Sequence, residues 1–136
     1  MKIRKPKNKE LIDIKKFVDS FPEVESDEHT YSVDYLSETL EKGILFIAET
    51  NEQLVGCIFG RYSKEDKWAD LLVIVVKKNF QKKGIGKELL LAFEEVCNKK
   101  GIISIDTMAN KSAANLFHSA NYTPGRTYIS FQKKLK

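Results

Sequence analysis

The sequence predicts a mixed α/β fold, in which a mostly antiparallel sheet carries helices on both faces. Three apolar, strand-like segments follow one another with only short turns between them, which favours antiparallel neighbours. Farther along the chain, helical and strand-like segments alternate, which favours parallel strands joined by crossover helices. The length of 136 residues suits one domain, taken as residues 1–136, and can bury a core without disulfides.

The N-terminal half is expected to form a short strand near Ile3, two helices and then three strands. The helices follow from apolar residues spaced three or four apart, and Gly43 stands where a helix commonly ends. Asn51-Glu52 is expected to form a hairpin turn. The expected helices span 8–20 and 31–42, and the expected strands span 44–49, 54–62 and 68–76.

The C-terminal half is expected to alternate between helix and strand. Apolar residues on one face predict a helix over 85–100, which ends at Gly101. A strand over 102–107 follows, and Asn110 is expected to cap a helix over 111–120. Alternating side chains predict a final strand over 126–135.

Composition excludes several classes of protein. The chain is 42% hydrophobic and 31% charged, which is typical of a soluble globular protein. No apolar run approaches the roughly 18 residues that cross a membrane, and the basic N-terminus lacks the apolar core of a signal peptide, so a cytoplasmic protein is expected. The net charge of +4 is mild, and no basic stripe with interleaved aromatic residues is present, so nucleic-acid binding is only a weak alternative.

Metal and redox chemistry are not expected. Cys57 and Cys97 both lie in apolar segments, where cysteine usually serves as a small buried hydrophobic residue. His29 and His118 are far apart in the sequence and give no spacing typical of metal ligands.

The most informative stretch is Gln81-Lys82-Lys83-Gly84-Ile85-Gly86. It follows an apolar strand and opens an amphipathic helix, which is an arrangement that binds phosphates. A helix start offers unpaired N–H groups and the positive end of the dipole, and glycines let the backbone approach an anion. Lysines around the turn add positive charge. The stretch therefore predicts a diphosphate-containing cofactor, although the same pattern also occurs in plain tight turns.

A second block, Asn110 to Tyr122, joins this loop in a resemblance to a known family. The order of elements and the two motifs together resemble the GNAT acetyltransferases over nearly the whole chain. The resemblance implies a sheet whose two central parallel strands splay apart, with acetyl-CoA in the cleft between them. It also implies an acetyl-CoA-dependent N-acetyltransferase that transfers acetyl directly to a primary amine, such as a small cationic amine or a protein amino group.

The resemblance carries over residue by residue. The strand end would offer backbone groups to the pantetheine arm, the loop would hold the pyrophosphate, and the later asparagine would contact the cofactor. The residues so implied are Ile74, Val75, Val76, Gln81, Lys82, Lys83, Gly84, Ile85, Gly86, Lys87, Asn110 and Phe117.

Acetyl transfer to an amine needs a base for the amine proton, a donor for the carbonyl oxygen and help for the leaving thiolate. Many family members use a tyrosine as the acid where this chain has Phe117, which cannot donate a proton. Asp106 and Asp70 are the candidate bases, with a solvent-facing position as the alternative for each. His118 is expected at the surface, while Tyr122 and Tyr128 are other sources of a hydroxyl.

The acceptor side is less defined. An acidic segment, containing Asp19, Glu23, Glu25, Asp27 and Glu28, would favour a cationic amine, or is simply a solvated loop. Tyr31 and Tyr35 nearby would line a pocket or pack the second helix. The final strand would pair across a homodimer or close the sheet. Because of Phe117, the alternative function is an acetyl-CoA-binding regulatory or sensor module with little catalysis.

Overall fold

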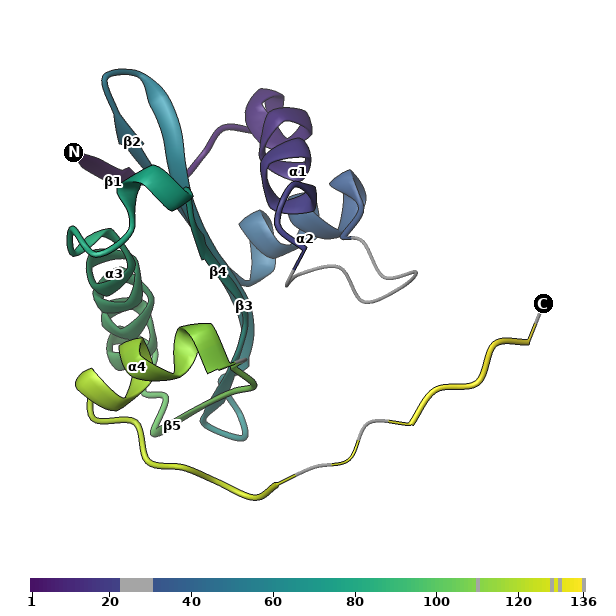
Figure 1. Ribbon diagram of the computed structural model, residues 1–136. Coiled ribbons are helices and arrows are strands. Elements are labelled where there is room, and N and C mark those ends of the chain that lie inside the picture. The colour runs from purple at the N-terminus through teal and green to yellow at the C-terminus, as the bar shows by residue number, and fades with distance from the viewer. Residues whose placement is uncertain (23–30, 110, 128, 130, 136) are drawn as a thin grey trace.

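The computed structural model describes residues 1–22, 31–109, 111–127, 129 and 131–135 (Figure 1). Its strands and helices follow the expected order up to the last strand, with ends shifted by a few residues. The strands are β1 (Lys2–Arg4), β2 (Ile44–Thr50), β3 (Gln53–Ser63), β4 (Trp68–Val76) and β5 (Ser104–Thr107). The helices are α1 (Leu11–Asp19), α2 (Val33–Lys42), α3 (Ile85–Lys99) and α4 (Lys111–Ser119), with short 3-10 turns η1 (Asn8–Glu10) and η2 (Lys78–Phe80).

The sheet has the order β1-β2-β3-β4-β5, and only β4 and β5 run parallel. This confirms the mixed, mostly antiparallel sheet. In Figure 1, α1 and α2 lie on one side of the sheet and α3 on the other. Each face has its own core, one with Leu11 and Leu36 against Phe59, and one with Leu89 and Phe93 against the opposite side of the strands.

Local signals set several of the boundaries. Asn51 and Glu52 both have positive φ, 49° and 61°, which matches the tight turn expected between β2 and β3. The Ser32 side chain accepts a hydrogen bond from the Tyr35 N–H at 3.0 Å and so caps α2. Gly101, at φ 75°, follows the end of α3. No helix in the described ranges is long and apolar enough to cross a membrane.

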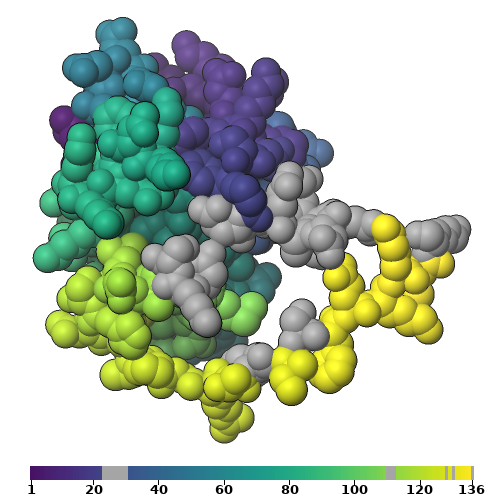
Figure 2. All heavy atoms as spheres, viewed as in Figure 1, coloured from purple at the N-terminus to yellow at the C-terminus, as the bar shows by residue number. Residues whose placement is uncertain are grey.

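The expected final strand is wrong for the part of 126–135 that the structure describes. These residues form an extended arm that stands away from the body (Figures 1 and 2). Ile129 and Phe131 are 79% and 90% exposed. Alternating side chains give a segment strand character, but a strand also needs a neighbouring strand edge to pair with, and no described strand pairs with this arm.

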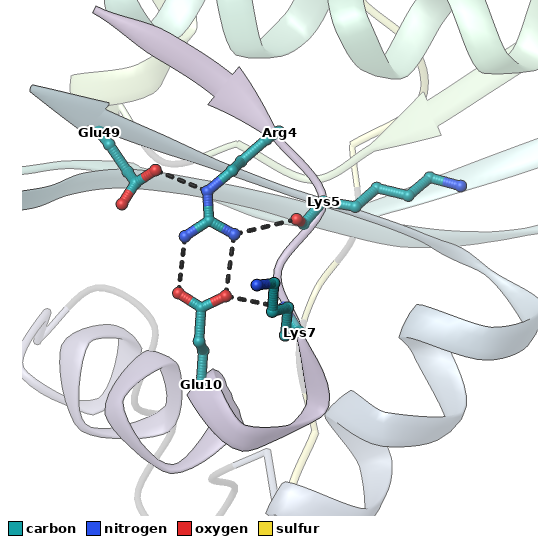
Figure 3. Close-up of polar contacts among 5 residues, drawn as sticks. All are labelled: Arg4, Lys5, Lys7, Glu10 and Glu49. Atoms are coloured by element: carbon teal, nitrogen blue, oxygen red, sulfur yellow. Dashed lines mark hydrogen bonds and ion pairs between the residues drawn. The ribbon is translucent and has the colours of Figure 1, made fainter. Parts of the chain in front are cut away.

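Arg4 joins the first strand to the helical layer (Figure 3). Its Nη1 and Nη2 donate to the two carboxylate oxygens of Glu10 at 2.8 and 2.6 Å, and its Nε donates to Glu49 Oε1 at 2.6 Å. Glu10 also accepts from the Lys7 N–H at 2.8 Å. The hydrogen bond from Arg4 is the main reason that the pKa of Glu10 falls to about 2 and that the pKa of Glu49 is lowered.

Arg4→Met is expected to destabilise the protein by about 1 kcal/mol at neutral pH, because both carboxylates lose their partner. Lowered pKa values stabilise the fold above the ordinary glutamate value of 4.5 and cease to do so as the pH falls through about 2. The difference in melting temperature between variant and parent should therefore shrink across this window. Lys99→Met is the control, since its pair with Glu95 is exposed and should contribute little. An equal difference at both ends of the window would contradict the assignment.

Candidate active site

The sheet opens at one edge, where β4 and the edge strand β5 part. The two strands pair only from Trp68 to Leu71 and from Ser104 to Thr107. The Thr107 hydroxyl donates to the Leu71 carbonyl at 3.0 Å where the pairing ends. Beyond this point β4 continues to Val76 without β5 beside it, and its free edge lines a cleft of about 660 Å³. The splayed parallel pair implied by the resemblance is therefore present, although it lies at the edge of the five-stranded sheet and not at its centre.

A β-bulge lies at the same place. Phe59 pairs with Val73 but Gly60 pairs with Leu71, so Leu72 is an extra residue on β4. A bulged residue is left out of the ladder and bends its strand, which makes its backbone groups available to a ligand. Leu72 lines the cleft. No local sequence pattern predicts this bulge, because it depends on the register between two strands.

Gln81 to Lys87 form one end of the cleft. Lys82 and Gly84 have left-handed φ values of 62° and 86°, and α3 begins directly after them. The first bond of this helix runs from the Glu88 N–H to the Gly84 carbonyl at 3.0 Å. The N–H groups of Ile85, Gly86 and Lys87 therefore precede the helical ladder and suit an anion.

Two side chains of the loop are held in place. The Gln81 Nε2 donates to the Val76 carbonyl at 3.0 Å, which ties the loop to the end of β4. The Lys83 ammonium lies 5.5 Å from the centre of the Phe80 ring. The sequence placed both residues in the binding loop but could not assign these contacts.

Most residues carried over from the resemblance line this cleft, namely Ile74, Val75, Val76, Gln81, Lys82, Gly84, Gly86 and Lys87. Three do not. Ile85 is buried in the core, Phe117 is 7% exposed and packs in the same core, and Lys83 lies beside Phe80. Asn110 lies outside the described residues.

Sequence reasoning missed part of the wall. Helix α4 contributes Ala113, Asn115, Leu116 and Ser119. Tyr31, for which a pocket wall was one of the two expected positions, also lines the cleft. The helical spacing of the α4 residues was a usable signal, since positions three or four apart share a face. It did not reveal which face of α4 would meet the cleft.

The two candidate bases lie side by side. Asp70 on β4 and Asp106 on β5 are partners in the parallel register, just before the strands part. Asp70 Oδ2 lies 3.4 Å from Arg61 Nη2. Asp106 is exposed and borders a second depression of about 460 Å³, beside His118. Neither aspartate is in the wall of the larger cleft.

Of the two tyrosines considered as other sources of a hydroxyl, the structure describes only Tyr122. Tyr122 donates to Glu94 Oε2 at 2.8 Å and packs edge-on against Phe117, with ring centres 5.2 Å apart. Burial, followed by this hydrogen bond, raises the pKa of Tyr122 well above its ordinary value. The Tyr122 hydroxyl therefore already donates its hydrogen bond to a residue of α3. Tyr128 lies outside the described residues, as do Glu23, Glu25, Asp27 and Glu28.

Two further groups take no part in the cleft. His118 is exposed, as expected. Burial raises the pKa of the Cys57 thiol to about 12 and that of Cys97 to about 11, which makes both unreactive at neutral pH. Within the described ranges, no group of three or more His, Cys, Asp or Glu residues is placed to hold a metal ion.

Comparison with known proteins agrees with this geometry. Residues 12–122 match the sequence profile of the Acetyltransferase (GNAT) family. An aminoglycoside acetyltransferase, meta-AAC0020, from an uncultured soil metagenomic sample has 20% identity and a TM-score of 0.77, with 99% of this chain and 96% of that chain covered. The PaiA N-acetyltransferase of Thermoplasma acidophilum, solved with coenzyme A, has 21% identity and a TM-score of 0.77, covering 93% and 92%.

Ard1 from Thermoplasma volcanium has 18% identity and a TM-score of 0.74, with 92% of this chain and 84% of that chain covered. At these identities the structures establish a shared fold. No curated protein matches the sequence of this chain.

Proposed function

The chain belongs to the acetyltransferase (GNAT) family, and we propose that it transfers the acetyl group of acetyl-CoA directly to a primary amine. Membership of the family establishes acetyl transfer and the use of acetyl-CoA. The direct route and the amine acceptor are the proposal. The observation that carries it is the cleft between β4 and β5, which has the open start of α3 at one end and the bulge at Leu72 in its wall.

The cleft suits an extended cofactor with a charged end. The edge of β4 from Leu72 to Val76 offers N–H and C=O groups that would pair with the amides of the pantetheine arm. The start of α3, with Lys82 and Lys87 beside it, would hold the diphosphate. We expect the thioester to lie near the bulge at Leu72, separated from the diphosphate by the length of the pantetheine arm.

The reaction joins the amine nitrogen to the thioester carbonyl carbon and releases coenzyme A. A backbone N–H at Leu72 would stabilise the developing oxyanion, because the bulge frees it from the ladder with β3. Asp106 would take the amine proton through water, with Asp70 as the second candidate. Asp70 and Asp106 form the pair directly before Leu71 and Thr107, the last pair before β4 and β5 part.

The acceptor is proposed to be a cationic small amine. Asp106, together with Asp70, whose charge Arg61 partly offsets, would give the region beside the strand split a negative character that attracts such a molecule. Two of the similar structures are aminoglycoside acetyltransferases, and these support a small acceptor. A protein amino group is the second candidate.

The test begins with calorimetric titration of the full-length protein with acetyl-CoA. Aminoglycosides, polyamines, and peptides with a free lysine or N-terminus are then screened for release of coenzyme A thiol. Release with a small amine supports the proposal, and release only with peptides replaces the acceptor. Binding without release from any amine would favour the alternative of an acetyl-CoA-binding regulatory module, which the buried Phe117 motivates.

Asp106→Asn is expected to lower kcat by about 100-fold, as is typical when a general base is lost, while the Kd for acetyl-CoA stays unchanged. Asp70→Asn is the matched comparison, because the two residues are register partners and lose the same charge. Steady-state rates from about pH 6 to 9 measure both. Equal rates for Asp106→Asn and the parent across this range would remove Asp106 as the base, and a loss confined to Asp70→Asn would transfer the role.

The wider setting is also part of the proposal. The chain acts as a single domain, works in the cytoplasm without nucleic acid, and forms a homodimer. The exposed Ile129 and Phe131 on the C-terminal arm support the dimer, since a second copy would cover them. Sedimentation of the full-length protein beside a Phe131→Glu variant would measure this, and a parent that sediments as a monomer at all concentrations would end the dimer proposal.

A further inference from the structure

Tyr31 lines the cleft and packs with the core that α1 and α2 share with the sheet, whereas the phosphate loop leads into α3. Tyr31 is half-buried and lines the same cleft as Leu72 and Val73. Its ring packs edge-on against Phe59, with ring centres 5.0 Å apart. Phe59 is the register partner of Val73, next to the bulge. The Tyr31 ring therefore lies near the bulge at Leu72, which is where the thioester is expected.

The position of Tyr31 is fixed by its neighbours. The Lys15 Nζ donates to the Tyr31 carbonyl at 3.0 Å and to Asp19 Oδ2 at 2.9 Å, which ties the tyrosine backbone to α1. The Tyr35 ring lies 5.1 Å from the Tyr31 ring and supports it from α2. A side chain held from α1, α2 and β3 keeps its orientation, which a proton donor requires.

Several charged or titratable groups face this phenol. Burial is the main cause that raises the pKa of Tyr31, and Tyr35 on α2 and Asp70 on β4 raise it further. Arg61 on β3 opposes them, and Lys15 on α1 lies at the backbone. The net direction is upward, so the hydroxyl keeps its proton at neutral pH and is suited to donate it rather than to act as a base.

No other described tyrosine offers a hydroxyl to the cleft. The α4 position that carries a tyrosine in many family members is Phe117, whose side chain is buried. Tyr122 is bonded to Glu94 on α3. Tyr35 stacks on Tyr31, and Tyr62 has the Lys100 ammonium 5.7 Å from its ring centre; neither lines the cleft.

We propose that the Tyr31 hydroxyl is the general acid of the transfer, which takes the place of the absent α4 tyrosine. The inference rests on the proposed function. As the N–C bond forms and the C–S bond breaks, the electron pair of that bond stays on sulfur and the Tyr31 proton moves to it, giving the free thiol of coenzyme A. The proton released by the amine returns through water to the phenolate, which restores Tyr31.

The test compares Tyr31→Phe with Tyr35→Phe in the full-length protein. The two tyrosines stack on each other, yet only Tyr31 lines the cleft, so Tyr35→Phe controls for the loss of a hydroxyl in the same cluster. Tyr31→Phe should lower kcat by about 100-fold, within the range for general acids, with the Kd for acetyl-CoA within about twofold of the parent. Tyr35→Phe should keep both values within about twofold.

A second readout separates proton donation from packing. Replacing Tyr31 by a fluorinated tyrosine keeps the shape of the ring but lowers the pKa of the phenol. An acid works below its pKa, so kcat should fall as the pH rises through that value, and fluorination should move this fall to lower pH. The same replacement at Tyr35 should shift the fall much less, because Tyr35 lies outside the cleft and acts on the Tyr31 phenol only through their electrostatic coupling.

Tyr31→Phe with a kcat near that of the parent, or an alkaline limb that fluorination does not move, would overturn the role of Tyr31. Either result would leave the transferase proposal standing. A parent protein that binds acetyl-CoA but transfers to no amine would instead count against the proposed function itself, and with it against any acid. The retained Kd of each variant shows that its cleft is folded.

Discussion

Gly84→Asp is expected to weaken acetyl-CoA binding by about 100-fold or more, because it sets a carboxylate against the diphosphate at the start of α3. Gly84 has a φ of 86°, and a Cβ at this position would meet nothing within 4 Å. The side chain therefore has room, and its cost to folding is limited to about 1 kcal/mol for the left-handed backbone. Calorimetric titration measures the loss of binding.

Two controls isolate the charge. Gly101→Asp, at the other end of α3, has a φ of 75° and the same open space, so it carries similar backbone strain away from the loop. Gly84→Asn keeps the shape of aspartate without its charge. We expect Gly101→Asp to bind normally and Gly84→Asn to lose less affinity than Gly84→Asp. Unchanged affinity in Gly84→Asp would mean that the loop is structural, and the cofactor residues assigned around it would be withdrawn.

Gly60→Ala is expected to destabilise the protein by about 2–3 kcal/mol, which is the cost of overpacking a core. A Cβ at Gly60 would collide with the Asp70 carbonyl oxygen and lie 2.9 Å from the Phe93 ring. Neither the Asp70 carbonyl nor the Phe93 ring can move aside, because Asp70 is in the neighbouring strand and Phe93 packs α3 into the core. Thermal unfolding should show a fall in Tm of about 10 °C.

Gly125→Ala is the matched control for this second prediction. A Cβ at Gly125 meets nothing within 4 Å, and its backbone is not in the left-handed region. Its Tm should stay within about 1–2 °C of the parent, because Gly→Ala at a compatible position is neutral or slightly stabilising. If Gly60→Ala unfolds at the parent temperature, the close approach of β3, β4 and α3 beside the bulge is looser than the structure has it.

Several parts of this protein were determined by the sequence alone, since they depend on neighbours in the chain. The tight turn at Asn51-Glu52 and the helix end at Gly101 follow from which residues tolerate positive φ. The phosphate loop is also local, because a strand end, a glycine and a helix start lie within a few residues of Gly84. The resemblance to the GNAT family rested on this local pattern, and the family is confirmed over residues 12–122.

Contacts between distant segments were decided only by the tertiary structure. The sequence could not show that Leu72 forms a bulge or that Tyr31 lines the cleft while Tyr35 does not. Nor could it show that the Tyr122 hydroxyl donates a hydrogen bond to Glu94. It also assigned a strand to the C-terminal arm. The physical reason is common to all of these: periodicity and turn chemistry fix what one segment can become, whereas register, a facing wall or a partner edge depends on packing against residues far away in the chain.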